Sequence, residues 1–336
     1  MAETFQIAII GAGGISGAHS AAAKASGGRI AVTAVVDPSE QAAAKLAGEH
    51  GAQAFADVAE LLRAKAKGTV KFAAAVVATP PSIRLKIIEA LLKAKVPVLM
   101  EKPIAHTLAD AKKLTAMANK HKTVRSFVAY CHRFAPPVVA LKEHLAAGKI
   151  GKVIRIENAF ACDLPGHKDK WFSDPKRAGG GAFLDMGSHS LDLLAFVMGP
   201  CAVVGAVFDH KWKGRTETAA TVLLKNTKKQ NPNLGAGTAA VVISGWAETS
   251  RFTLAAEGDA GTLIYDYEKP EEIIFKDLAG KTDVLKMESH GIRFTKQLLA
   301  FADAVQGKKK TSLASFADGL SAAALGDRAA KLGKAK

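Results

Sequence analysis

An aspartate and a histidine that can act together in proton transfer, Asp185 and His189, lie four residues apart. They belong to a glycine-rich segment, GGGAFLDMGSH over residues 179–189, that runs into a helical pattern. Side chains four residues apart lie on one side of a helix and can converge. A histidine titrates near neutral pH and can take a hydroxyl proton, while a carboxylate orients it and holds its charge. The pair equally fits a capping aspartate and a packed histidine.

A lysine directly follows an apolar run, in the tripeptide Glu101-Lys102-Pro103. In a parallel sheet with helices on both faces, the carboxyl ends of the strands line the ligand crevice. Because the next residue is a proline with a fixed φ, Lys102 is held in a definite direction. A cation there can bind a substrate hydroxyl and stabilise it as the proton leaves. Taken alone, the tripeptide also fits a surface lysine in a loop.

A glycine-rich turn, GAGGISG over residues 11–17, follows an apolar run and opens a helical pattern. Dinucleotide binding needs a tight turn without side chains, a backbone that can touch the pyrophosphate, and a helix N-terminus aimed at its charge. Gly11 and Gly13 meet the first two needs, and Ser16 replaces the third glycine of the fingerprint. Asp37 ends the next apolar run 26 residues after Gly11, where a carboxylate can accept from a ribose hydroxyl. We therefore predict a dinucleotide site in preference to an ordinary turn with an acidic cap.

The first third of the chain has the alternation of strands and helices that such a site requires. Apolar runs separated by helix-length segments predict a parallel sheet wound on both faces. The predicted strands are 5–11, 30–37, 52–55, 72–79 and 96–100, and the predicted helices are 15–26, one opened by Pro38-Ser39-Glu40, 57–65 and 82–95. We assign residues 1–125 to an N-terminal Rossmann domain with a doubly wound parallel sheet.

Beyond residue 125 several strand-like runs follow one another without helices between them. This pattern predicts a C-terminal α+β domain over residues 126–336, built on a large, mostly antiparallel open sheet. The predicted strands are 152–160, 203–211, 218–224, 237–246, 252–257 and 261–266, the predicted helices are 188–198, 291–305 and 313–332, and a long glycine-rich loop is predicted over 163–182. The whole chain is therefore expected to be an α/β protein of two docked domains.

Composition excludes several other classes. The 336 residues are 49% hydrophobic and 23% charged, enough to bury two cores. The net charge of +15 is spread along the chain without a nucleic-acid motif, so we expect a solvated basic surface and no nucleic-acid partner. No leader or membrane-spanning run is seen, which predicts a cytoplasmic protein. The three cysteines lack CxxC spacing and predict reduced thiols, and we expect no metal site.

Taken together, the motifs resemble the glucose–fructose oxidoreductase / inositol dehydrogenase family (Gfo/Idh/MocA) over essentially the whole chain. The resemblance rests on GAGGISGAH at 11–19, ATPPS at 78–82, EKP at 101–103, YCHRF at 130–134, GGGAFLDMGSH at 179–189 and EGDAGTL at 257–263. It implies Lys102, Asp185 and His189 as the catalytic group, with His189 the base. Cofactor contacts are implied at Gly11, Gly13, Gly14, Ile15, Ser16, Asp37, Thr79, Pro80, Pro81, Glu101 and Lys102.

On the substrate side we expect Tyr130, Arg133, Trp171 and His189. An aromatic face at Trp171 can stack on the C–H surface of a sugar, and a tryptophan that anchors its loop fits as well. The chain departs from the family pattern at Ser16, at Arg84, where a histidine is common, and at Cys131-His132, where an asparagine is frequent. Neither Arg84 nor Cys131-His132 touches the catalytic three, but both can alter the cofactor or substrate pocket.

The resemblance implies an NAD(P)-dependent oxidoreductase that moves a hydride between nicotinamide and a secondary alcohol or ketone of a sugar, inositol or related polyol. NAD is expected over NADP, because Asp37 would repel a 2′-phosphate and no arginine stands beside it. Two alternatives stay open: an enzyme that recycles tightly bound NAD during sugar elimination or glycoside cleavage, and a non-catalytic NAD-sensing regulator. The family's open sheet implies a homodimer or homotetramer, and the active site is expected in the cleft between the domains.

Overall fold

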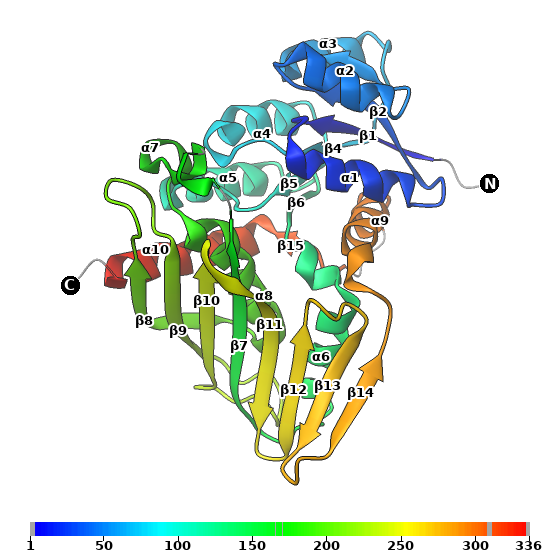
Figure 1. The fold of residues 1–336 in the computed structure, drawn as a ribbon. Helices are drawn as coiled ribbons and strands as arrows, with labels where there is room; N and C mark the ends of the chain where they lie inside the picture. Colours follow the sequence, from blue (N-terminus) through cyan, green and yellow to red (C-terminus); the bar gives the residue numbers. More distant parts are fainter. Residues whose placement is uncertain (1–3, 165, 170, 308–310, 334–336) are drawn as a thin grey trace. The chain divides into compact units, whose positions relative to one another are not determined.

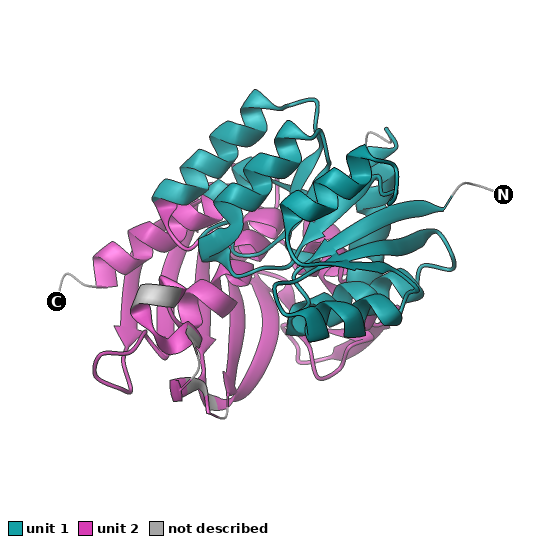
Figure 2. Cartoon of the chain, turned by 90° about the horizontal axis from the view of Figure 1, so that it is seen from above, with its two compact units in different colours: residues 1–105, 109–131, 292–320 teal, residues 106–108, 132–291, 321–336 magenta. Residues whose placement is uncertain are grey.

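A computed structural model describes residues 4–164, 166–169, 171–307 and 311–333. Contacts divide the chain into two compact units, which Figure 2 shows in different colours. Unit 1 comprises residues 1–105, 109–131 and 292–320, and unit 2 comprises 106–108, 132–291 and 321–336. Each unit is built around its own sheet.

Unit 1 is a Rossmann fold with a seven-stranded sheet in the order β15-β6-β5-β4-β1-β2-β3. All its pairs are parallel except β15 with β6. The strands are β1 (Phe5–Ile10), β2 (Ile30–Val36), β3 (Gln53–Phe55), β4 (Ala74–Val77), β5 (Val98–Glu101), β6 (Ser126–Ala129) and β15 (Ala314–Ser315). The helices are α1 (Gly14–Lys24), α2 (Glu40–Gly48), α3 (Val58–Ala66), α4 (Arg84–Lys93), α5 (Leu108–Lys120) and α9 (Arg293–Val305), with the 3₁₀ turn η1 (Pro81–Ile83).

The central strands of unit 1 form because their residues are apolar on both faces. Every residue of β4 and β5 is buried, as expected for parallel strands covered by helices on both sides. Strand β1 lies between β2 and β4, so the chain reverses its direction of winding there. Ligands bind at such a switch point, beside the carboxyl ends of the strands. The predicted turns at residues 11–16, 79–81 and 101–102 all follow strands that end at this edge.

Two of the predicted helix starts in unit 1, those of α2 and α3, are confirmed by their capping side chains. Ser39 Oγ accepts from the Ala42 amide at the start of α2, and Asp57 Oδ1 accepts from the Glu60 amide at the start of α3. The prediction of one continuous helix over 82–95 is wrong at its beginning, because Pro81–Ile83 form a 3₁₀ turn before α4. Arg84 is thereby the first residue of α4.

Residues 292–320 return to unit 1, which the sequence pattern did not predict. Phe301 of α9 packs edge-on against Phe5 and Phe127, with ring centroids 6.5 and 6.2 Å away. Asp303 of α9 pairs with Arg29 at 2.6 Å, and α9 packs along α1. The predicted boundary follows residue 125, whereas the parallel sheet extends to β6 at 126–129 and takes β15 from residues 314–315. The predicted helix over 313–332 is corrected to this strand followed by α10 (Phe316–Gly333).

Unit 2 contains an eight-stranded open sheet in the order β14-β13-β12-β11-β7-β10-β9-β8. It is antiparallel except between β7 and β10, which confirms the predicted mostly antiparallel sheet. Its strands are β7 (Val153–Asp163), β8 (Cys201–Asp209), β9 (Ala219–Asn226), β10 (Ala239–Gly245), β11 (Ala247–Gly258), β12 (Gly261–Asp266), β13 (Glu272–Asp277) and β14 (Thr282–Lys286). Helices α6 (Pro136–Ala146) and α8 (Ser188–Met198) pack on one face, as Figure 1 shows, and β9 alternates buried and exposed residues accordingly.

The predicted loop over 163–182 is corrected in its interior. It contains the short helical turns η3 (His167–Asp169), η4 (Trp171–Ser173) and α7 (Pro175–Ala178). These turns are too short for a sequence pattern to reveal them.

Within the described part of the chain, no helix combines the length and the apolar character needed to cross a membrane.

Candidate active site

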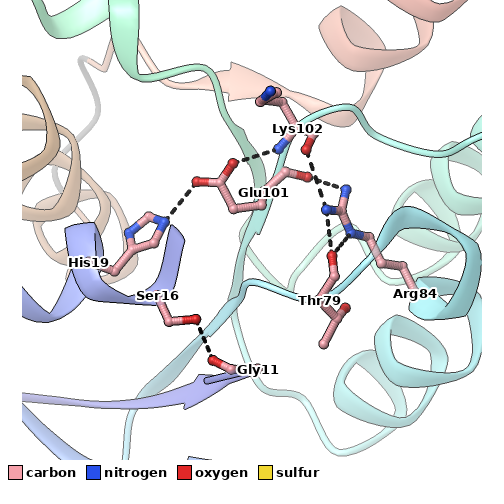
Figure 3. Close-up of polar contacts among 7 residues, drawn as sticks. All are labelled: Gly11, Ser16, His19, Thr79, Arg84, Glu101 and Lys102. Atoms are coloured by element: carbon pink, nitrogen blue, oxygen red, sulfur yellow. Dashed lines mark hydrogen bonds and ion pairs between the residues drawn. The ribbon is translucent and has the colours of Figure 1, made fainter. Parts of the chain in front are cut away.

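The glycine turn between β1 and α1 is held tightly from inside unit 1. Gly11 has φ +99°, and a Cβ there would lie 2.7 Å from the Ala78 carbonyl oxygen, so only glycine fits. The Gly11 amide donates to the Val36 carbonyl at 2.7 Å. Ser16, which stands in place of the third fingerprint glycine, is fully buried and donates from Oγ to the Gly11 carbonyl at 2.6 Å (Figure 3). The serine therefore ties the turn to the first turn of α1.

The next residues leave the start of α1 open. Gly13 is the N-cap and provides no capping side chain, and the first turn has no acidic residue. Gly13, Gly14 and Ile15 are exposed, and nothing lies within 4 Å of a Cβ built on either glycine. A helix N-terminus whose backbone amides have no hydrogen-bond acceptor attracts a phosphate group. This open turn fits the pyrophosphate of a dinucleotide.

Asp37 lies beside the glycine turn. Its Oδ2 accepts from the Ala12 amide at 2.8 Å, and its Oδ1 accepts from the Ser39 amide at 2.9 Å. The carboxylate is thereby fixed at the end of β2 while its residue stays partly exposed. Carboxylate oxygens have further acceptor positions, which suit a ribose hydroxyl.

The turn after β4 carries Thr79, Pro80 and Pro81. The Thr79 carbonyl accepts from Nε and Nη2 of Arg84 at 3.0 and 2.7 Å. Thr79 Oγ1 is buried and has no hydrogen-bond partner among the described residues. Pro80 is exposed, and Pro81 begins η1. A cofactor role for these three residues stays a prediction.

The end of β5 carries a buried polar network. Glu101 is only 3% exposed, and its Oε1 lies 2.8 Å from Nε2 of His19, a residue with no exposed surface. Its Oε2 accepts from the Lys102 amide at 3.1 Å (Figure 3). Lys102 is partly exposed, and its peptide bond to Pro103 is cis. Glu101 thus holds the backbone of Lys102 from inside the unit, a contact that the motif EKP did not reveal.

In unit 2 the predicted catalytic pair lies where a helix changes type. Asp185 lies within the π-helix η5 (Phe183–Gly187), and His189 is the second residue of α8. π-helical turns are rare and often found at functional sites. Both side chains are partly exposed. The N-cap of α8 is Gly187, so the alternative interpretation of Asp185 as the helix cap is wrong.

The residue that holds the start of this segment is Glu217, which no sequence motif indicated. One of its carboxylate oxygens, Oε1, accepts from the amides of Gly181 and Phe183 at 2.7 and 3.1 Å. Its backbone carbonyl accepts from the Ala182 amide at 3.0 Å. A Cβ at Gly181 would lie 2.0 Å from that carbonyl, which explains a glycine there. Because Glu217 comes 32 residues after Asp185, no local sequence signal connects them.

His189 has aromatic neighbours from several elements of unit 2. Its ring meets the ring of His132 edge-on, with centroids 4.7 Å apart, and the ring of Phe160 at 6.4 Å. Nδ1 of His132 lies 3.3 Å from the hydroxyl of Tyr267. The departure at His132 therefore places a second imidazole beside the candidate base.

The predicted substrate residues have different environments. Tyr130 is 1% exposed and belongs to unit 1. Arg133 belongs to unit 2 and forms a buried bidentate ion pair with Asp192, through Nε at 2.8 Å and Nη2 at 2.6 Å. The backbone of Trp171 begins η4, but its side chain lies outside the part that the structure describes. Substrate contacts at these positions stay predictions.

The three cysteines are free thiols. Burial raises the pKa of Cys131 and of Cys201 to about 11, and burial together with Asp185 and Asp163 raises the pKa of Cys162. Among the described residues, no group of three His, Cys, Asp or Glu side chains could hold a metal ion.

The three predicted catalytic residues come from both units. Lys102 belongs to unit 1, whereas Asp185 and His189 belong to unit 2.

Unit 1 is a Rossmann fold with an open glycine turn and a fixed carboxylate beside it, and unit 2 has an open sheet. These features define a class of two-domain, nucleotide-dependent enzymes. The comparisons agree. Residues 5–130 match the model of an oxidoreductase family with an NAD-binding Rossmann fold, and residues 138–264 match the GFO/IDH/MocA C-terminal domain. The chain belongs to the GFO/IDH/MocA family of oxidoreductases, and unit 1 contains its NAD-binding domain.

Similar sequences include the rhizopine catabolism protein MocA of Rhizobium meliloti, 28% identical over 58% of this chain and 57% of that protein. The levoglucosan dehydrogenase of Pseudarthrobacter phenanthrenivorans is 23% identical over 59% of this chain and 56% of that protein. The 1,5-anhydro-D-fructose reductase of Ensifer adhaerens is 30% identical over 56% and 55%. The matches thus span little more than half the length of these relatives.

Solved structures share the fold over nearly the whole chain. A levoglucosan dehydrogenase in complex with NADH and levoglucosan superposes with a TM-score of 0.82, at 19% identity over 99% of this chain and 98% of that one. An oxidoreductase from Agrobacterium radiobacter in complex with NAD⁺, L-tartaric acid and magnesium superposes with a TM-score of 0.81, at 20% identity over 99% and 97%. These likenesses show the two-domain fold.

Proposed function

We propose that this protein transfers a hydride between a nicotinamide nucleotide and a secondary alcohol or ketone of a sugar, inositol or related polyol. The observation that supports the proposal is the open glycine turn in the NAD-binding domain of a chain of this family, together with the presence of Lys102, Asp185 and His189. Relatives named as a levoglucosan dehydrogenase, a 1,5-anhydro-D-fructose reductase and an inositol 2-dehydrogenase support the substrate class.

Each of the three residues has a separate role in this proposal. Oxidation of an alcohol removes a hydride from carbon and a proton from oxygen, and the bound nicotinamide supplies the hydride acceptor. His189 takes the hydroxyl proton, Asp185 orients the imidazole and stabilises its charge, and Lys102 stabilises the developing alkoxide. In the reverse direction His189 returns the proton to the oxygen of the carbonyl.

The test uses Lys102→Met and His189→Ala, each assayed for NAD binding by calorimetry and for turnover. The substrate panel is levoglucosan and myo-inositol with NAD, and 1,5-anhydro-D-fructose with NADH. Loss of the base should lower turnover by about 10²- to 10⁴-fold and leave NAD affinity nearly intact. Wild-type turnover in both variants would remove these residues from catalysis. NAD(H) that stays with the protein through desalting would favour the cofactor-recycling alternative.

We further propose that NAD is preferred over NADP. The Asp37 carboxylate is fixed beside the glycine turn by the Ala12 and Ser39 amides, and Pro38-Ser39-Glu40 supply no cation for a 2′-phosphate. Titration of both cofactors tests this, with Asp37→Ser as the matched variant. NADP should gain affinity relative to NAD in Asp37→Ser, and tighter NADP binding by the wild type would overturn the assignment.

The open sheet of unit 2 is also proposed as the contact between subunits of a homodimer or homotetramer. Its strands expose large apolar side chains, among them Ile154, Val207 and Leu223. Leu223 pairs across the sheet with Val241, so two apolar side chains lie next to each other on β9 and β10. Light scattering should give an oligomer for the wild type and a smaller species for Leu223→Asp. A monomeric wild type would contradict the proposal.

A further inference from the structure

Arg84 is a buried cation at the edge of the Rossmann sheet where β4 and β5 end. It stands where the family resemblance leads one to expect a histidine, and it is 2% exposed. Its Nε and Nη2 donate to the Thr79 carbonyl at 3.0 and 2.7 Å. Its Nη1 donates to the carbonyls of Glu101 and Pro103, and Nη2 also donates to the Lys102 carbonyl at 3.3 Å. These five contacts equal the five N–H donors of a guanidinium.

All the acceptors are backbone carbonyls from two strand ends. Thr79 follows β4, and the other three carbonyls are consecutive at the end of β5. Figure 3 shows the guanidinium between the two segments, with the Lys102 carbonyl turned toward it and the Lys102 side chain extending away. Arg84 therefore contacts the main chain of Lys102 and leaves its ammonium group to other partners.

The opposite side of the same backbone is held by Glu101. Its carboxylate accepts from the Lys102 amide at 3.1 Å and lies 2.8 Å from Nε2 of the buried His19. Both backbone polar groups of Lys102 are thus occupied, the amide by Glu101 and the carbonyl by Arg84. The direction in which the Lys102 side chain leaves the main chain is set by these two contacts.

The burial of the charged Arg84 side chain carries a desolvation cost. Burying a cation costs several kcal/mol unless hydrogen bonds and an opposite charge compensate. Burial lowers the pKa of Arg84 to about 10, although the Glu101 carboxylate and Tyr130 oppose this, so the group stays charged at neutral pH. A lysine would keep the charge but has donors on one nitrogen only, and these cannot reach all four carbonyls in a fixed plane.

We propose that Arg84 is a positioning residue for Lys102: it joins the ends of β4 and β5 and fixes the backbone from which the Lys102 side chain projects. The inference rests on the proposed catalytic role of Lys102. It assigns a function to a residue at which this chain departs from the family pattern.

The test compares Arg84→Lys and Arg84→Met with Leu91→Ala, a truncation of a buried residue seven positions further along the same helix α4. The first readout needs no substrate. Deuterium exchange of peptides covering residues 98–104 should accelerate about tenfold in both Arg84 variants, because a lost hydrogen bond of about 1.4 kcal/mol permits local opening. It should stay at the wild-type rate in Leu91→Ala. Equal exchange in Arg84→Lys and the wild type would overturn the proposal.

The second readout is a double-mutant cycle with Lys102→Met, measured on the sugar panel given above. Arg84→Lys should lower kcat about 10- to 100-fold with the dissociation constant for NAD changed less than threefold. In the Lys102→Met background the same substitution should change kcat less than twofold, because its target is gone. Equal fold-losses in both backgrounds would overturn positioning. Wild-type turnover of Lys102→Met would instead refute the proposed function, and the exchange result would show whether Arg84 still orders the loop.

Discussion

Alanine at Gly13 should weaken nucleotide binding and leave the fold intact, whereas alanine at Gly11 should destabilise unit 1. Gly11 has φ +99°, which costs a side chain about 1–3 kcal/mol. Its Cβ would also lie 2.7 Å from the oxygen and 2.9 Å from the carbon of the Ala78 carbonyl, which is backbone and cannot rotate away. Together we expect a loss of about 2–4 kcal/mol and a fall in Tm of about 5–15 °C.

Gly13 differs in both respects. Its φ is −79°, and a Cβ there meets nothing within 4 Å. Since alanine is a poorer N-cap than glycine, the free energy of unfolding should fall by no more than about 1 kcal/mol. A methyl group would occupy space that a pyrophosphate needs, and NAD affinity should fall at least about tenfold, or 1.4 kcal/mol.

Urea denaturation and calorimetric titration with NAD measure the two quantities on the same samples. The comparison is informative because both glycines lie in one turn and receive the same methyl group. Wild-type NAD affinity in Gly13→Ala would refute the idea that the open turn receives the phosphates. Wild-type stability in Gly11→Ala would refute the contact with the end of β4.

Three further outcomes are expected. Glu217→Ala removes two amide contacts at the start of the π-helix and should lower the free energy of unfolding by about 1–3 kcal/mol, with Glu217→Gln intermediate. An unchanged denaturation midpoint would contradict this. Asp192→Ala leaves the buried Arg133 guanidinium without its carboxylate and should cost about 3–5 kcal/mol by the same assay, which a surface-like loss below 1 kcal/mol would disprove. The pKa of Cys131 is about 11 in the folded protein, above the unfolded value near 9. The thiol therefore loses its proton first in the unfolded state, and its contribution to stability should fall as pH rises from about 9 to 11. Native iodoacetamide labelling at pH 8 should accordingly spare it, and rapid labelling would argue against burial.

The parts of the fold that sequence patterns predicted are those with a strong local period. The strands β1, β2 and β4 are apolar runs interrupted by at most one polar residue, and β12 was predicted at its observed bounds, Gly261–Asp266. Strands β13 and β14 were missed because they are half exposed and carry charged residues, so their alternation is weak. The return of residues 292–320 to unit 1 depends on packing between distant segments, which no local pattern contains.

The same distinction between local patterns and long-range packing holds for the residues of the candidate site. Motif spacing predicted that Gly11, Asp37 and Lys102 stand at strand ends, and each directly follows a strand in the structure. Their functional roles stay predictions. Motif spacing could not find Glu217, which contacts the segment before Asp185 from another part of the chain. Nor could it find what Arg84 does, because its five contacts are with main-chain carbonyls, whose positions depend on the fold alone.

The interrupted path of the chain through unit 1 has a consequence for its synthesis. A ribosome makes the first 131 residues, then the 160 residues from 132 to 291, and only afterwards the segment that supplies α9 and β15. At about 5–20 residues per second, the nascent Rossmann sheet waits roughly 8–30 s for these elements. During this interval α1 lacks α9, and Phe5 and Phe127 lack the ring of Phe301. The apolar side chains that α9 later covers therefore stay uncovered on the growing chain until residues 293–305 have been made.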